Sequence, residues 1–231
     1  MKWLFAGLAA SLLIWAQPAA AQSILRDAET EAMFNDMSRP LILAAGLSPN
    51  NVRVVLINDD SINAFTAGGQ TIYVNSGLIQ AADNANQVQG VIAHELGHVA
   101  DGHVVLIDAG ARPAMGISIL SMVLGIAAIA AGAPEAGAGI LSAGTTAAEG
   151  KFLAFSRVQE STADATGAKF LRESGISGKG MLSFFKKLAN EEYAYGLKNI
   201  DPFAQSHPLS GERIAKDRKS TRLNSSHESP S

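Results

Sequence analysis

Apolar residues recur along this 231-residue chain at the three-to-four-residue spacing of an amphipathic helix in several segments. This spacing predicts helices over residues 24–45, 87–103, 151–173, 179–192 and 209–218. In the first segment acidic residues lie near the start, where they favour a helix N-terminus. Gly46 follows that segment as a stop signal.

A stretch between the first two predicted helices has the composition of β-strands. Residues 52–58 are rich in Val, Leu and Ile, which favours a strand. Residues 63–67 and 70–74 flank Gly68-Gly69, and a glycine pair between two such runs is a strong signal for a two-residue hairpin turn. We therefore expect one strand and then a hairpin before the helix at 87–103.

The helix at 87–103 carries the sequence His94-Glu95-Leu96-Gly97-His98. Residues at i and i+4 share one helix face, so the two histidines project together, as two ligands of one zinc ion must. Glu95 follows His94 directly, where its carboxylate can take a proton from a water molecule at the metal. The alternative is an ordinary amphipathic helix with two histidines, because the pentapeptide also occurs by chance.

Zinc enzymes usually supply three protein ligands, and without cysteine the third must be His, Glu or Asp. Glu160 is the best candidate, because Glu160 and Asp164 again share a helix face. One carboxylate can bind the metal while the other accepts the free ring N–H of a ligand histidine. By spacing alone, Glu149, Glu173 and Asp101 compete equally.

The two ends differ in character from the rest. Lys2, an apolar run over residues 3–15 and Ala19-Ala20-Ala21 form a secretory signal pattern, so residues 1–21 are expected to be a signal peptide and the location periplasmic. A retained N-terminal anchor is the alternative. Residues 22–218 have the length of one domain, and residues 219–231 read as a disordered or non-native tail.

Composition excludes some partners and cross-links. The formal net charge is −3 and the sequence shows no basic stripe, so we expect no nucleic-acid partner. There is no cysteine, so no disulfide can form.

Residues 113–148 are apolar and rich in glycine. Residues 113–134 carry no charge and are long enough for a transmembrane helix. A single crossing would separate the motif histidines from Glu160, and residues 136–148 look too short for a return crossing. We therefore expect a buried helical hairpin, or a flexible flap that covers the cleft or makes peripheral contact with a membrane.

Several blocks, in order along residues 24 to about 218, resemble the BepA- and HtpX-like zinc metallopeptidases, the family that includes the CAAX prenyl endopeptidases. The pair of blocks at 94–98 and 160–164 resembles the family's H-E-x-x-H and E-x-x-A-D motifs. The further blocks are Asn63-Ala64-Phe65 with Gly68-Gly69, and Ser206-His207-Pro208 with Arg213-Ile214. The signal peptide favours the periplasmic BepA-like branch.

The resemblance implies an α+β gluzincin domain, mostly helical, with a small sheet or hairpin beside the active-site helix. It implies that one zinc ion per chain is bound by His94, His98 and Glu160. Glu95 is then the general base and Asp164 supports a ligand. The edge strand holds an extended substrate through Asn63, Ala64 and Phe65. Core packing is the other interpretation of Phe65.

The resemblance also draws attention to two late residues. His207 is expected to face the metal, where it either stabilises the oxyanion or occupies the open metal position and keeps the enzyme inactive. Arg213 is expected to position His207 or to bind the reaction intermediate. His103 is expected to lie off the ligand face, in a structural role.

The expected function is that of a zinc-dependent endopeptidase of the cell envelope. Its substrates are expected to be polypeptides, namely misfolded or unassembled (outer-)membrane proteins. One alternative is a chaperone-like binding module, and another is a latent protease gated by His207 and the apolar segment 113–148.

Overall fold

The computed structural model describes residues 23–25, 27–195, 207 and 213, and for residues 23 and 191–195 it describes the backbone only. The predicted signal peptide, the predicted helix at 209–218 and the tail at 219–231 therefore lie outside the described residues, except for Arg213.

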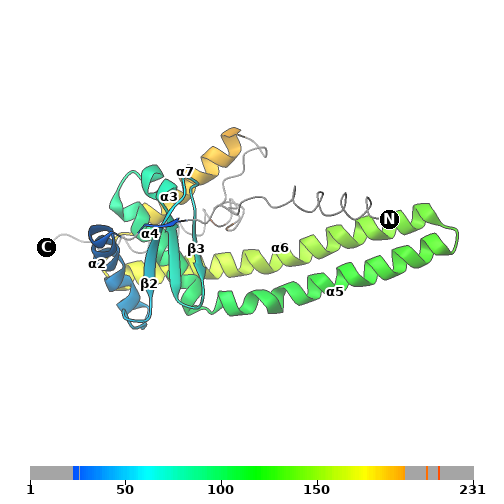
Figure 1. The fold of residues 1–231 in the computed structure, drawn as a ribbon, viewed down its shortest axis with the longest axis horizontal. Helices are drawn as coiled ribbons and strands as arrows, with labels where there is room; N and C mark the ends of the chain where they lie inside the picture. The colour runs from blue at the N-terminus through cyan, green and yellow to red at the C-terminus, as the bar shows by residue number, and fades with distance from the viewer. Residues whose placement is uncertain (1–22, 26, 196–206, 208–212, 214–231) are drawn as a thin grey trace, which may run out of the picture.

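The described elements confirm an α+β domain that is mostly helical with one small sheet (Figure 1). In chain order they are β1 (Ser23–Ile24), α2 (Ala28–Ala44), β2 (Arg53–Asn58), β3 (Ala64–Ala67), β4 (Thr71–Asn75), α3 (Ser76–Ala81), α4 (Ala85–Ala100), α5 (His103–Ala130), α6 (Pro134–Glu173) and α7 (Lys179–Tyr195).

The sheet has the strand order β1-β2-β4-β3. Strands β3 and β4 form the predicted hairpin, but its loop has three residues, 68–70, rather than the predicted two, because Ala67 pairs with Thr71. Gly68 and Gly69 in this loop have φ angles of 61° and 96°. Those positive angles suit glycine, which has no Cβ to clash. Strand β2 pairs with β4 in parallel, so β3 is left at the edge of the sheet beside α4.

The predicted start of α2 and the predicted end of α4 are wrong. Helix α2 begins at residue 28, because the Asp27 carboxylate caps it by accepting from the Thr30 backbone N–H at 3.1 Å, while Ser23 and Ile24 pair with β2. Helix α4 ends at Ala100, because Gly102 adopts φ 68° and His103 opens α5.

Helices α4 and α6 pack closely because two glycines lie at their contact. A Cβ on Gly97 would lie 2.6 Å from the carbonyl oxygen of Ala163, and one on Gly167 would lie 2.8 Å from that of Ala93. Any larger residue would push the helices apart. This contact places the motif of α4 beside residues 160–164 of α6.

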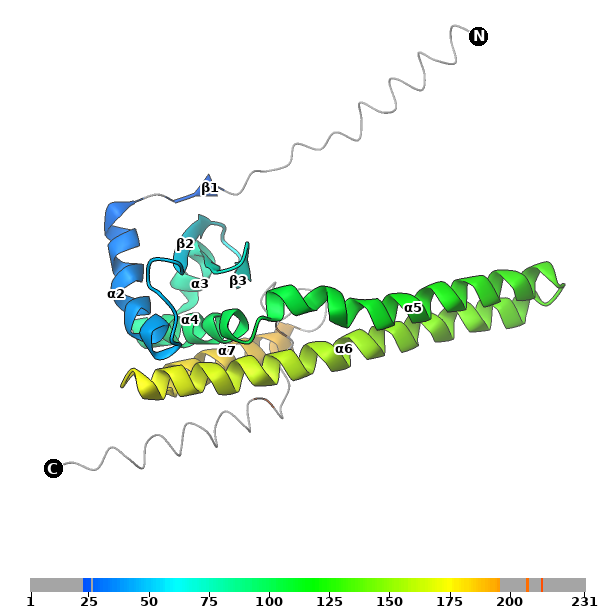
Figure 2. The same ribbon diagram turned by 90° about the horizontal axis from the view of Figure 1, so that it is seen from below.

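Helices α5 and α6 form a long hairpin that projects from the body of the protein (Figure 2). Its apolar part is exposed, so the predictions of a buried hairpin and of a flap over the cleft are wrong. The segments 136–148 and 151–173 belong to one continuous helix of 40 residues. The length argument against a return crossing therefore fails, because residues 136–148 do not form a separate element.

Candidate metal centre and catalytic site

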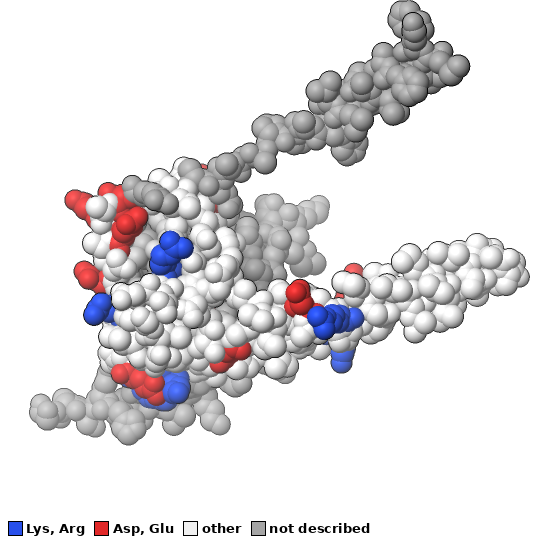
Figure 3. All heavy atoms as spheres, turned by 60° about the horizontal axis from the view of Figure 1, so that its bottom comes forward, with Lys and Arg blue, Asp and Glu red and all other residues white. Residues whose placement is uncertain are grey.

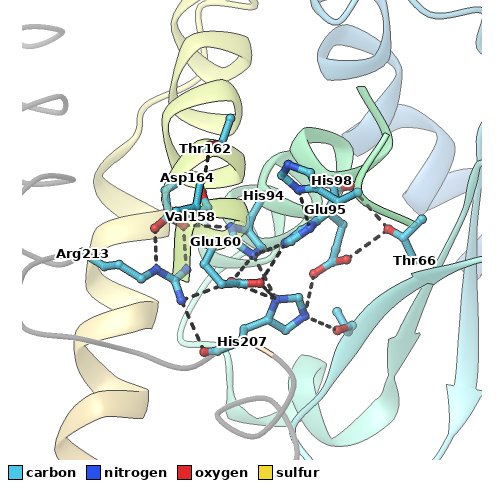
Figure 4. A network of polar contacts seen from close by, with 12 residues as sticks. Thr66, His94, Glu95, His98, Val158, Glu160, Thr162, Asp164, His207 and Arg213 are labelled. Carbon is cyan, nitrogen blue, oxygen red and sulfur yellow. Dashed lines mark hydrogen bonds and ion pairs between the residues drawn. The ribbon is translucent and has the colours of Figure 1, made fainter. Parts of the chain in front are cut away.

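Four buried side chains place potential metal-binding atoms within 4.8 Å of one another, and they are His94, His98, Glu160 and His207. His94 and His98 lie one turn apart on α4, with their Nε2 atoms 3.1 Å apart (Figure 4). Such a buried set of imidazole nitrogens and a carboxylate fits a zinc ion.

The structure selects Glu160 from the four acidic candidates. Its carboxylate lies 3.4 Å from His94 Nε2 and 3.3 Å from His98 Nε2. Asp101 instead accepts a hydrogen bond from Thr166, and Glu173 pairs with a lysine of its own helix. Glu149 lies exposed on the projecting hairpin. Glu160 is therefore the acid that can share a metal ion with the two histidines.

Asp164 lies behind the histidines, as the shared helix face with Glu160 predicted. The Nδ1 atom of His94 lies 2.9 Å from Asp164 Oδ1. A hydrogen bond there turns the Nε2 atom of His94 toward Glu160 and the other potential ligands. The Arg213 guanidinium donates two hydrogen bonds to the same carboxylate, at 2.7 and 2.8 Å.

The carboxylates set the charge of the site. Burial alone would lower the pKa of His94, but Asp164 and Glu160 outweigh it and raise that pKa to about 10. Burial alone would raise the pKa of Glu160, but the histidines around it hold it well below its ordinary value. Burial lowers the pKa of His98, so His98 is neutral at pH 7 and ready to bind a metal.

Glu95 is fully buried and points toward the sheet rather than into the ligand cluster (Figure 4). Its Oε2 accepts a hydrogen bond of 3.1 Å from the Thr66 hydroxyl, and its Oε1 lies 3.3 Å from His207 Nε2. Thr66 was not singled out in the sequence, although it directly follows Phe65 in the predicted edge strand. The carboxylate thus lies between the metal ligands and β3, where a general base is needed.

His207 enters the ligand cluster from the C-terminal part of the chain. Its Nδ1 lies 3.2 Å from both His94 Nε2 and the Glu160 carboxylate. Its Nε2 can donate a hydrogen bond to the carbonyl oxygen of Ala64 at 3.3 Å. In that case the Nδ1 lone pair faces the other potential metal ligands. This orientation is the one that a fourth metal ligand requires.

Arg213 is buried and lies beside Asp164 (Figure 4). Besides its bonds to Asp164, it contacts Glu160 at 3.1 Å and donates to the His207 carbonyl at 3.4 Å. Its guanidinium lies 5.9 Å from the ring centre of Phe185, whose edge also packs on His94. Of the two roles expected for Arg213, these contacts favour the positioning of His207 over the binding of a reaction intermediate.

His103 lies closer to the site than its spacing predicted. Because α4 ends at Ala100, the chain turns and brings His103 Nδ1 to 3.0 Å from His98 Nδ1. The prediction assumed that the helix continues, which is wrong, but His103 does lie outside the group of potential metal ligands. An Asp101-Gly102 pair is a turn signal, and it is the sequence feature that could have revealed this contact.

The predicted substrate strand lies along the site. Ala64 is buried with its carbonyl against His207, and Asn63 accepts a backbone hydrogen bond from Asn75 at 2.9 Å. Phe65 stacks on Tyr73 with ring centres 5.1 Å apart, and it also lines the cleft, so a contact with substrate stays a prediction.

A cleft of about 410 Å³ opens over the metal-binding side chains. One wall is apolar and consists of Phe65, Val104, Ile107, Phe152 and Leu153. Four of these residues come from the bases of α5 and α6, so the hairpin forms part of the cleft without covering it.

The chain is similar to known peptidases over most of its length. The model of peptidase family M48 matches residues 25–220. The beta-barrel assembly-enhancing protease of Escherichia coli is 26% identical over 83% of this chain and 39% of its own length, and that of Yersinia pestis is 27% identical over 86% and 40%. Metalloprotease LoiP of Escherichia coli is 34% identical over 71% of this chain and 60% of its own length.

This chain thus spans about two fifths of the length of the beta-barrel assembly-enhancing proteases that it matches. The family match includes both motifs, the edge strand and the late His-Pro block. It confirms the predicted resemblance and the predicted class of enzyme, a metalloendopeptidase. The protein belongs to peptidase family M48.

Proposed function

We propose that this protein is a zinc-dependent endopeptidase of the cell envelope that hydrolyses misfolded or unassembled outer-membrane proteins. The observation that carries the proposal is the buried cluster of His94, His98 and Glu160 with the Glu95 carboxylate beside it. The names of relatives in the beta-barrel assembly pathway support the envelope location and the substrate class. The signal-peptide pattern over residues 1–21 supports a periplasmic location.

We assign one zinc ion per chain to His94, His98 and Glu160, because two imidazoles and one carboxylate are a common ligand set of catalytic zinc. A zinc ion held there supplies Lewis-acid catalysis and makes water a nucleophile at neutral pH. Glu95 takes the proton of the attacking water and delivers it to the leaving amine. Asp164 keeps the ring of His94 in the orientation that binding requires.

The substrate would lie extended along β3, which is the edge strand on the α4 side of the sheet. Asn63, Ala64 and Phe65 would supply backbone hydrogen bonds and a side-chain contact by strand addition. The apolar wall of the cleft would accept a large apolar side chain next to the cleaved bond.

The test is to measure zinc content and casein cleavage of the purified protein and of Glu95→Gln. We expect one zinc per chain in both proteins and cleavage only in the wild type, because the substitution removes the base and leaves the ligands. Glu173→Gln, on α6 but away from the cluster, is the matched control. Wild-type cleavage by Glu95→Gln would refute the mechanism. Zinc without any cleavage would favour the chaperone-like alternative.

A latent protease is the second candidate, and one observation favours it. His207 would be a fourth protein ligand, and catalytic zinc sites keep one position open. If His207 closes the site, His207→Ala cleaves casein faster than the wild type. If His207 stabilises the oxyanion, the same variant loses about 10²-fold or more in kcat. The hairpin does not cover the cleft, so gating is assigned to His207 alone.

We also propose that residues 113–148 contact a membrane. Helix α5 is long and apolar enough to cross one by length and composition, and only 6% of its most apolar window is buried.

A further inference from the structure

The projecting hairpin has its large side chains outside and its small ones inside. Large apolar side chains of α5 that are about half or more exposed include Ile119, Leu120, Met122, Val123, Leu124 and Ile126. Since these positions are consecutive or nearly so, the exposed apolar surface covers the sides of α5 that do not face α6. A protein partner would cover one face, whereas a lipid bilayer surrounds a helix on every side.

Small residues hold the two helices together. A Cβ on Gly144 would lie 2.1 Å from the Cβ of Ser121, and one on Gly137 would lie 2.4 Å from the Ile129 side chain. Gly125 makes the same kind of contact with Leu141. Helices in membranes associate through such small residues, because burying large apolar side chains gains little there.

Three hydroxyl groups of the hairpin form hydrogen bonds within their own helices. The hydroxyls of Ser121, Thr145 and Thr146 each donate to the carbonyl oxygen four residues earlier, at 2.8 to 3.2 Å. A helix that uses its own carbonyls in this way needs no water for those side chains.

Figure 3 shows charged side chains toward the base of the hairpin and none on the distal part of the face in view. Within residues 113–148 the sequence has one charged residue, Glu135, which lies near the turn between the two helices. The charged base consists of Asp108, Arg112, Glu149, Lys151 and Arg157. Residues 113–130 and 134–148 are about 27 and 22 Å long at a rise of about 1.5 Å per residue. The hydrocarbon core of a bilayer is about 30 Å thick. An inserted hairpin would therefore bring Glu135 close to the far interface.

We propose that residues 113–148 insert as a helical hairpin into a lipid bilayer, with the charged base at the near surface. This inference rests on the proposed function, which places the protein beside a membrane of the cell envelope. It goes further than contact with the membrane surface, because the hairpin enters the bilayer. The chain enters along α5 and returns along α6, so the motif of α4 and Glu160 of α6 stay on one side. The cleft, whose wall includes Phe152 and Leu153, then opens beside the membrane surface.

The test is flotation with vesicles of phosphatidylcholine and phosphatidylglycerol. The protein is prepared from Gln22 onward, because the apolar segment 3–15 would bind lipid by itself. We expect the wild type to float, Leu120→Asp to stay at the bottom, and the matched control Leu43→Asp, an equally exposed leucine of α2, to float.

Both tryptophans lie at positions 3 and 15, so this form has none, and Val123→Trp and Val105→Trp each provide a single probe. We expect vesicles to shift the emission of Val123→Trp to shorter wavelength, and lipids brominated deep in the acyl chains to quench it. Val105→Trp, at the base, should show neither effect. Equal quenching of the two probes, or an absence of flotation, would overturn the proposal. An absence of flotation with a concentration-dependent dimer would assign the hairpin to a second copy instead.

Casein cleavage by the same samples separates the two proposals. Leu120→Asp lies far from the cleft and should cleave casein at the wild-type rate in the absence of vesicles. A wild type that floats but does not cleave casein would refute the peptidase and leave the insertion standing.

Discussion

His94 presents its Nε2 atom to the ligand cluster because its Nδ1 atom is held by Asp164, and Asp164 is held in turn by Arg213. His98 has a similar partner in His103. At the scale of single residues, the site therefore consists of potential ligands and of side chains that orient them. Such supporting contacts fix the tautomer and direction of a ligand histidine.

Asp164→Asn should weaken zinc binding by about 10 to 100-fold, because the amide is a poorer acceptor for the ring N–H of His94. The dissociation constant is measured by competition with a chelator. Glu173→Gln on the same helix serves as the control and should bind zinc like the wild type. Unchanged affinity in Asp164→Asn would show that Asp164 does not orient His94.

His103→Ala should weaken zinc binding by about tenfold, since His98 loses the acceptor of its Nδ1–H. His103→Gln retains an acceptor and should recover part of that affinity. If both variants bind zinc like the wild type, His103 has only a packing role.

Zinc uptake near neutral pH should release about one proton from His94, because its pKa of about 10 leaves it protonated in the metal-free protein. The metal competes with that proton, so affinity rises with pH by about tenfold per unit below the pKa. Calorimetry in buffers of different ionisation enthalpy, between about pH 6.5 and 8, measures both quantities. Affinity that does not change over this range would contradict the raised pKa.

At the scale of elements, the position of α4 against α6 decides whether the two motifs meet. Gly97 and Gly167 allow the helices to approach until backbone touches backbone. Helix α6 continues into the hairpin, where Gly125, Gly137 and Gly144 have the equivalent role between α5 and α6. Glycine thus determines helix spacing both at the metal site and in the projecting segment.

Gly97→Ala should destabilise the protein by about 1 to 3 kcal/mol, because the new Cβ would overlap the Ala163 carbonyl. Zinc affinity should fall as well, because the helices carry the ligands. Gly150→Ala is the control, since its Cβ would meet nothing within 4 Å and alanine favours a helix by roughly 0.5 to 1 kcal/mol. Urea unfolding measures the stability of the two variants. A Gly97→Ala variant as stable as the wild type would show that the contact between α4 and α6 is not tight.

At the scale of the whole molecule, the hairpin and the catalytic body share the cleft. Four of the five residues of its apolar wall come from the bases of α5 and α6, whereas Phe65 and Thr66 come from β3. A substrate would therefore lie between the sheet edge and the hairpin base (Figure 2).

Phe152→Ala should lower kcat/KM by roughly tenfold for peptides with a large apolar residue at the cleaved bond, because it shortens the apolar wall. Peptides with small residues there should be cleaved as before. Met33→Ala, a partly exposed residue of α2 outside the cleft, is the control. An equal loss for both peptide classes would assign Phe152 to folding rather than to selection.

The sequence by itself determined the local features of this protein. The shared face of His94 and His98 follows from helix periodicity, and the β3–β4 turn follows from the backbone freedom of Gly68 and Gly69. The pairing of Glu160 with Asp164 was likewise readable from spacing within one helix. These features depend only on residues a few positions apart.

Only the tertiary structure decided which distant groups meet. Glu160 was distinguished from Glu149, Glu173 and Asp101 by the close contact of α4 with α6, and not by its own surroundings in the chain. The approach of His103 to His98 depends on a turn at Gly102. The exposure of the hairpin depends on what packs against it. Composition shows that residues 113–148 are apolar, but only the packing shows that their large side chains face outward.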